Sequence, residues 1–206
     1  MSAKAHELTS VVVIGGSQGG VQALLQVVSE LPDDLPAAIL AVVHIGSSPS
    51  MLPSILSDLG KLPASHAKTG EQIKEGHVYV APPDHHLLVS DAYLHLSHGP
   101  RENGTRPAID PLFRTAARAY GAGTIGVILT GGMNDGTAGL REIKNYGGTT
   151  IVQDPSEAEV SSMPQSALEN VPIDYCTPLS HIPPLLVRLI SEAEKRPGKS
   201  NRIQFP

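Results

Sequence analysis

A run typical of a buried strand leads directly into a glycine-rich turn near the start of this chain. Residues 11–14 read Val-Val-Val-Ile, and residues 15–20 read Gly-Gly-Ser-Gln-Gly-Gly. Apolar residues then recur at helical spacing as far as Val28, and Leu31-Pro32 ends that segment. Strands without alternating polarity are typical of parallel sheets that are covered on both faces. The feature therefore favours an α/β fold with a tight turn between its first strand and its first helix.

The same alternation of strand and helix continues along the chain. Apolar runs predict further strands at 38–45, 124–129 and 149–153. Capping residues and helical spacing predict helices that begin near 48–50 and that span 111–120, 137–146, 164–169 and 182–194. Short runs at 77–81, 87–89 and 93–96 predict an antiparallel hairpin or meander.

These elements predict one α/β domain. We expect a doubly wound, Rossmann-like fold: a mostly parallel sheet with helices on both faces and an antiparallel hairpin at its edge. The expected boundaries are an N-terminal tail at 1–10, a single domain at 11–194 and a C-terminal tail at 195–206.

Composition excludes several classes of protein. With 206 residues, of which 40% are hydrophobic and 17% charged, the chain is expected to fold rather than to be disordered. The net charge of −5, without a block of Lys or Arg, argues against a nucleic-acid partner. The longest apolar runs are too short to insert into a membrane, and residues 1–10 lack a signal-peptide core. The single cysteine, Cys176, fits a reducing compartment and is expected to be a small buried residue. A cytoplasmic protein is therefore expected.

The glycine-rich turn can be compared with two known types of site, a dinucleotide-binding turn and a turn that carries a nucleophilic serine. A dinucleotide site requires G-x-G-x-x-G and an acidic residue after the second strand, but the middle glycine is replaced by Ser17 and the second strand ends at His44. The segment from Gly15 to Gly19 instead fits G-x-S-x-G, in which a sharp strand-to-helix turn presents a nucleophilic serine. A plain tight turn with a helix-capping serine is the alternative.

Two further residues of the right types are expected beside Ser17. His44 follows the next parallel strand and can accept the serine proton; alternatively it is a hydrogen-bonded core histidine. Asp135 lies in the loop after the strand at 124–129, at the same edge of the sheet. It can orient His44, and it can also cap the helix that follows it. Together the three residues predict a Ser-His-Asp triad.

Other polar residues have less specific interpretations. The pairs His85-His86 and His95/His98 lack the further ligands that a metal site requires, so neither metal nor cofactor is expected. Arg106 and Asp110 could shape a substrate cleft or hold the following helix. Met133 could fill a gap or form the lip of a cleft.

The chain closely resembles the catalytic domain of the chemotaxis receptor methylesterases, the CheB family, from about Val11 to Leu189. The motifs that carry this resemblance are residues 12–20, Val43-His44, 76–82 (Gly-His-Val-Tyr-Val-Ala-Pro), 106–110 with Leu112-Phe113, 129–136, Gln153-Asp154 and Met163-Pro164. It implies hydrolysis of glutamyl γ-methyl esters, and deamidation of glutamines, on the signalling helices of methyl-accepting receptors. It further implies Ser17 as nucleophile, His44 as base and Asp135 as the orienting carboxylate. Backbone N–H groups of Gln18 and of the loop 131–133, including Gly132 and Met133, are the expected oxyanion donors.

The chain departs from the family pattern in several places. Gln18 replaces the usual small residue, the order of Gly132-Met133 is reversed, and Thr105 stands where the family often has His. Many family members carry an N-terminal receiver domain, whereas here the resemblance starts about ten residues after Met1, so a stand-alone enzyme is expected. Two other functions stay open: a serine esterase or amidase of other specificity, and a catalytically weak receptor-binding module.

Overall fold

A central parallel sheet organises the protein, whose computed structural model describes residues 8–46 and 48–195. Its strands are β1 (Val11–Gly16), β2 (Ala38–Val43), β3 (Ala64–His66), β4 (Val78–Val80), β7 (Thr124–Ile128), β8 (Thr149–Gln153) and β9 (Tyr175–Thr177). They are arranged in the order β3-β4-β2-β1-β7-β8-β9, and all neighbouring pairs are parallel. The predicted doubly wound α/β fold is therefore confirmed. Apart from residues 8–10 and 195, the predicted tails lie outside the described residues.

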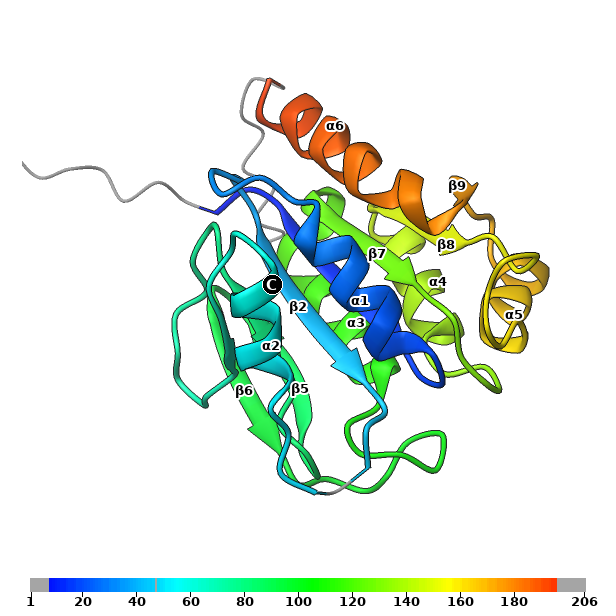
Figure 1. Cartoon of the computed structure of the whole chain (residues 1–206), viewed down its shortest axis with the longest axis horizontal. Coiled ribbons are helices and arrows are strands. Elements are labelled where there is room, and N and C mark those ends of the chain that lie inside the picture. The colour runs from blue at the N-terminus through cyan, green and yellow to red at the C-terminus, as the bar shows by residue number, and fades with distance from the viewer. Residues whose placement is uncertain (1–7, 47, 196–206) are drawn as a thin grey trace, which may run out of the picture.

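Six α-helices in the described residues cover the two faces of the sheet (Figure 1). They are α1 (Gly20–Ser29), α2 (Leu52–Leu59), α3 (Ile109–Tyr120), α4 (Thr137–Asn145), α5 (Ser162–Asn170) and α6 (Ile182–Glu194). Successive strand residues point to opposite faces. Val12 and Ile14 thus join a core cluster with residues of α1, α2 and α6, whereas Val11 and Val13 join one with residues of α3, α4 and α5.

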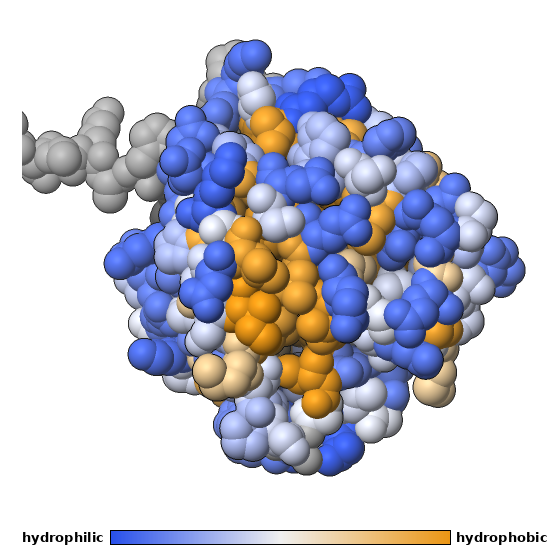
Figure 2. All heavy atoms as spheres, viewed as in Figure 1, coloured by the Kyte–Doolittle hydropathy of each residue, from blue (hydrophilic) through white to orange (hydrophobic). Residues whose placement is uncertain are grey.

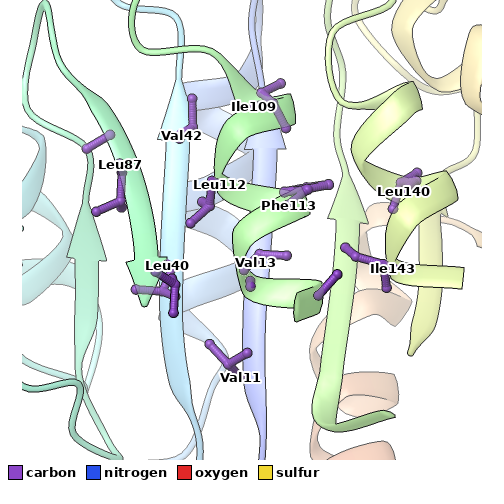
Figure 3. Close-up of a cluster of buried hydrophobic side chains, with 14 of the residues drawn as sticks. Val11, Val13, Leu40, Val42, Leu87, Ile109, Leu112, Phe113, Leu140 and Ile143 are labelled. Atoms are coloured by element: carbon purple, nitrogen blue, oxygen red, sulfur yellow. The ribbon is translucent and has the colours of Figure 1, made fainter. Parts of the chain in front are cut away.

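The second of these clusters holds α3 against the middle of the sheet (Figure 3). Leu112 and Phe113 of α3 are fully buried together with Val13 of β1 and Leu40 of β2. Burial of such a side chain contributes about 1.5–3 kcal/mol to folding. Because α3 also starts beside the carboxyl ends of the strands, this packing fixes the position of residues near its amino end.

A separate two-stranded sheet carries the predicted hairpin. Its strands β5 (His86–Ser90) and β6 (Tyr93–Ser97) pair antiparallel. The hairpin lies against α3, where the amide of Val89 donates to Thr115 Oγ1 at 3.1 Å. The run at 77–81 does not belong to this hairpin, contrary to the prediction. It forms β4, a buried parallel strand between β3 and β2, and its continuous apolar sequence suits that position.

Two other predictions were wrong, and two strands were missed. The helix expected near 48–50 begins at Leu52, because Pro53 occupies its first turn, while Ser50 Oγ accepts from the Leu52 amide at 3.1 Å. The short strands β3 and β9 were not predicted. Cys176 is exposed rather than buried, because it lies on the edge strand β9.

Hydrophobic side chains gather on the surface over α2 (Figure 2). Met51, Ile55 and Leu59 follow helical spacing there and are 69%, 41% and 61% exposed. Within the described part of the chain, no helix has both the length and the apolar composition needed to cross a bilayer.

Candidate active site

The site lies at the point where the order of the strands reverses. From β1 the chain winds through β2 to the edge strand β3, adds β4 between β3 and β2, and then returns to β7 on the other side of β1. Open α/β sheets bind their ligands at such a point, outside the carboxyl ends of the strands. Ser17 follows β1, His44 follows β2, and the loop that contains Asp135 follows β7. The topology therefore brings all three predicted residues to one crevice.

The glycine-rich turn is held by the loop after β7. Ser17 donates its backbone N–H to Thr130 O at 3.0 Å, and Thr130 Oγ1 donates to Gln18 O at 3.0 Å. Gly19 adopts a φ of 75°, and a Cβ there would lie 2.9 Å from Glu159 Cβ. Only glycine fits this conformation and this space, so α1 can begin at Gly20 directly behind the serine.

The structure places the side chains of Ser17, His44 and Asp135 in a continuous hydrogen-bonded row. His44 Nδ1 lies 3.2 Å from Ser17 Oγ, and His44 Nε2 lies 3.0 Å from Asp135 Oδ2. Ser17 and His44 are half-buried, whereas Asp135 is only 2% exposed. A carboxylate accepts only, so Nε2 carries the hydrogen and Nδ1 presents its lone pair to the serine. This is the reverse of the nitrogen usage in chymotrypsin-like proteases.

Asp135 is held in its ionised form. Burial alone would raise its pKa, but the His44 hydrogen bond, the Ile109 and Asp110 amides and the His44 charge outweigh burial and lower the pKa. The two amides donate to Asp135 at 2.8 and 3.1 Å. They belong to the first turn of α3, whereas the alternative role considered for Asp135, capping the helix that follows it, is not observed. The N-cap of α4 is Gly136. Asp135 instead accepts hydrogen bonds from free backbone N–H groups at the start of α3, a helix distant from it in sequence.

Two neighbours of Asp135 were not predicted to take part in its environment. Asn103 Nδ2 lies 2.7 Å from Asp135 Oδ1 and 2.8 Å from Asp110 Oδ2. Asp110 Oδ1 accepts the Gly139 amide at 2.7 Å, which ties α3 to α4. Burial, and secondarily the charge of Asp135, raise the pKa of Asp110. The Asn-Gly pair at 103–104 was a recognisable turn signal, but no sequence pattern indicated where the asparagine side chain would point.

Arg106 and Asp110 both hold backbone segments in place. Arg106 donates to Asp84 Oδ1 from Nε and Nη2 at 3.0 and 2.7 Å, and to the carbonyls of His98 and Gly99 from Nη1. These contacts join the loop before α3 to the end of the hairpin. Of the two interpretations left open, holding the following helix is supported for Asp110, which bonds α3 to α4. The hydrogen bonds of Arg106 hold the loop before that helix and do not reach the helix itself.

Two of the four amides considered as oxyanion donors are free within the described residues. The Gly131 N–H donates to Val160 O at 2.9 Å and the Met133 N–H to Ser162 Oγ at 3.2 Å. The amides of Gln18 and Gly132 have no such acceptor. Gly131 itself lies against the nucleophile, since a Cβ there would be 2.9 Å from Ser17 Cβ. Met133, with a φ of 65°, is 73% exposed, so it fills no gap in the core.

Two of the histidines considered as metal ligands, His85 and His86, have hydrogen-bond partners of their own. His86 is buried, with Nε2 2.9 Å from Pro100 O, and its Nδ1 accepts from the Ala108 amide. His85 and His98 have their ring centres 3.9 Å apart. Among residues 8–46 and 48–195, no group of three or more His, Cys, Asp or Glu side chains is arranged to hold a metal ion.

Comparisons with known proteins agree with this geometry. The family model described as CheB methylesterase matches residues 12–186. A Leptospira interrogans protein is 44% identical over 180 residues, which cover 86% of this chain and 93% of the relative. The protein-glutamate methylesterase/protein-glutamine glutaminase of Pyrococcus horikoshii is 38% identical, with 87% of this chain matching 50% of that protein.

A solved structure shares the fold as well as the sequence. The crystal structure of the Thermotoga maritima CheB methylesterase catalytic domain is 37% identical and has a TM-score of 0.83. The match covers 87% of this chain and 98% of that domain. The family model and the relatives, together with the shared fold, show that the chain belongs to the CheB methylesterase family.

Proposed function

We propose that this chain is a serine hydrolase that removes methyl groups from glutamyl γ-methyl esters and deamidates glutamines. The observation that carries the proposal is the row of hydrogen bonds from Asp135 through His44 to Ser17, at 3.0 and 3.2 Å. Nucleophile, base and orienting acid in this geometry are the requirements for acyl transfer through serine.

In the first half of the reaction Ser17 Oγ attacks the ester carbonyl while His44 Nδ1 takes the hydroxyl proton. Asp135 stabilises the imidazolium that forms, because its lowered pKa keeps it ionised and its Oδ2 accepts from Nε2. Collapse of the tetrahedral intermediate breaks the bond to the methoxy oxygen. His44 gives that oxygen its proton, so methanol leaves and an acyl-serine is formed.

The amides of Gln18 and Gly132 are assigned to the oxyanion. Both belong to loops beside Ser17, and neither has an internal acceptor among the described residues. Removal of one such donor typically costs about 2.7–4 kcal/mol of transition-state stabilisation. The position of α1 behind Ser17 adds the partial positive charge of a helix amino end.

The second half repeats these steps with water. His44 takes a proton from the water that attacks the acyl carbon and returns it to Ser17 Oγ, which frees the glutamyl carboxylate. Glutamine follows the same route with ammonia as the leaving group. No step in this sequence requires a cofactor.

The proposed substrates are the signalling helices of methyl-accepting chemotaxis receptors, and the proposed location is the cytoplasm. Family membership supports the receptor assignment. The single cysteine supports a reducing compartment.

The test is methanol release from a methylated receptor signalling domain, with the wild type compared with Ser17→Ala. We expect release by the wild type and its loss in the variant. Ser29→Ala, which changes a half-buried serine at the end of α1, is the control and should release methanol at the wild-type rate. A folded wild type that releases none would contradict the methylesterase function. Hydrolysis of p-nitrophenyl esters would then distinguish an esterase of other specificity from a binding module.

A further inference from the structure

A tight turn before α3 directs one amide side chain at the triad. The turn spans Glu102 to Thr105, with Asn103 and Gly104 at its corner at φ values of 52° and 77°. Glu102 and Thr105 exchange backbone hydrogen bonds at 2.9 and 3.2 Å. Two positive φ values at the corner are the condition of a type I′ turn, for which Asn-Gly is the preferred pair.

The turn is fixed to the same helix that holds Asp135. The Glu102 carboxylate accepts two hydrogen bonds from Arg114 Nη2 of α3, at 2.7 and 2.9 Å. Asp135 lies at the amino end of α3, on the amides of its first turn. The turn and the carboxylate therefore share one rigid support.

From this turn Asn103 reaches two buried acids with a single nitrogen. Its Nδ2 donates one hydrogen to Asp135 Oδ1 at 2.7 Å and the other to Asp110 Oδ2 at 2.8 Å. Asp110 and Asp135 are 5% and 2% exposed. Two such acids side by side repel each other when both are ionised, and an N–H donated to each one reduces that repulsion.

The amide also completes the hydrogen bonds that set the rotation of the Asp135 carboxylate. Oδ1 accepts from Asn103 and from the Asp110 amide, while Oδ2 accepts from the Ile109 amide and from His44. A rotation of the carboxyl group would break contacts on both oxygens. With both oxygens engaged, Oδ2 stays in line with His44 Nε2.

On the basis of the serine-hydrolase function proposed above, we propose that Asn103 is a positioning residue that orients Asp135 toward His44. It acts through Asp135, without contact to the substrate. Asn103 and Asp110 line a polar pocket of about 220 Å³, so loss of the amide would admit water in its place. Water can hydrogen-bond to the carboxylates, but it is not held by the turn and cannot fix their orientation.

The variant that isolates this role is Asn103→Gly. Glycine adopts the positive φ of the turn without strain, so the variant removes the amide and retains the backbone shape. Asp91→Gly is the matched control, since Asp91 has the same φ of 52° and is likewise exposed, but lies at the turn between β5 and β6, outside the triad. We expect Asn103→Gly to lower kcat for ester hydrolysis between about 10- and 100-fold with KM within about twofold. Asp91→Gly should leave both unchanged.

A double-variant cycle distinguishes positioning from general destabilisation. If Asn103 acts through Asp135, Asn103→Gly should cost no further activity in an Asp135→Ala background, because residues that act as a unit are not additive. Losses that multiply would overturn the proposal, as would a wild-type kcat in the single variant. Circular dichroism of each variant shows whether it folds.

Proton NMR separates this inference from the esterase function itself. The His44 Nε2–H that faces Asp135 should give a downfield resonance in the folded protein whether or not receptor esters are cleaved. We expect that resonance to shift or broaden in Asn103→Gly and to stay unchanged in Asp91→Gly. An unchanged resonance in Asn103→Gly contradicts the positioning role. Absence of methanol release from the wild type, with the resonance altered in the variant, contradicts only the proposed function.

Discussion

Asp135 Oδ2 lies 2.8 Å from the backbone nitrogen of Ile109, at the amino end of α3. The orienting acid of the triad is thereby also the acceptor for a helix start that precedes it by about 25 residues. Because the same oxygen accepts from His44, the first turn of α3 and the alignment of the histidine share one carboxylate as acceptor. This double use leads to separate predictions for activity and for stability.

For activity, Asp135→Asn should lower kcat about 10³–10⁴-fold, because an amide facing Nε2 favours the tautomer that places hydrogen on Nδ1. That tautomer cannot accept the Ser17 proton. Initial rates with a p-nitrophenyl ester measure the effect, and Asp91→Gly serves again as a folded control. A loss of less than tenfold would mean that His44 is oriented without this carboxylate.

For stability, the lowered pKa of Asp135 gives a defined pH dependence. Its folded-state pKa lies below the usual value of 3.8, so the ionised carboxylate stabilises the fold above about pH 4. This contribution is lost as the pH falls through the folded-state pKa. Urea unfolding of wild type and Asp135→Asn should show a stability difference at pH 7 that shrinks toward pH 3. A difference that does not vary with pH would contradict the assignment.

Gly15 makes a close contact that can be tested by compensation. A Cβ at this position of β1 would lie 2.4 Å from Ile109 Cγ2. Gly15→Ala should therefore destabilise the fold by about 1–3 kcal/mol, the usual cost of overpacking a core. In an Ile109→Ala background the added cost should largely disappear, which chemical denaturation of the four proteins of the cycle would show.

Gly132→Ala is the control for that measurement. A Cβ on Gly132 meets no atom within 4 Å, so its stability should match the wild type within about 0.5 kcal/mol. Equal destabilisation by Ala at positions 15 and 132 would contradict the role of the Ile109 contact.

The side chain of Gln18 should matter little for the chemical step. Gln18 is exposed, and it is the backbone amide that is assigned to the oxyanion. Gln18→Ala retains that amide, so kcat on a small ester should stay within about threefold of wild type. A larger change in KM with a receptor substrate would show that the side chain contacts the receptor, whereas a fall in kcat on the small ester would contradict the assignment.

The strands with continuous apolar sequence could be predicted from the amino-acid sequence, and the short polar strands could not. The run 149–153 was predicted with the bounds of β8, whereas Ala64–His66 and Tyr175–Thr177 have too few apolar residues to be distinguished from loops. Their strand structure comes from pairing with β4 and β8, a long-range interaction.

Ser17, His44 and Asp135 could be placed at one edge because each follows a parallel strand, a rule that needs only the order of the elements. The partners of Asp135 could not be predicted in this way. Asn103 and Ile109 reach it from a turn and a helix end that are separated from it by 32 and 26 residues. Such contacts depend on how α3 packs, which local sequence does not specify.

The location of the crevice on both sides of β1 also has a consequence for refolding. Nucleophile and base lie in the first 44 residues, but the acid follows β7, which pairs with β1 only when a chain segment of about 100 residues has closed. The rate at which hydrolysis recovers after dilution from denaturant therefore reports on that closure. The strands on one side of β1 can pair without producing activity, and turnover begins only when β7 has paired with β1.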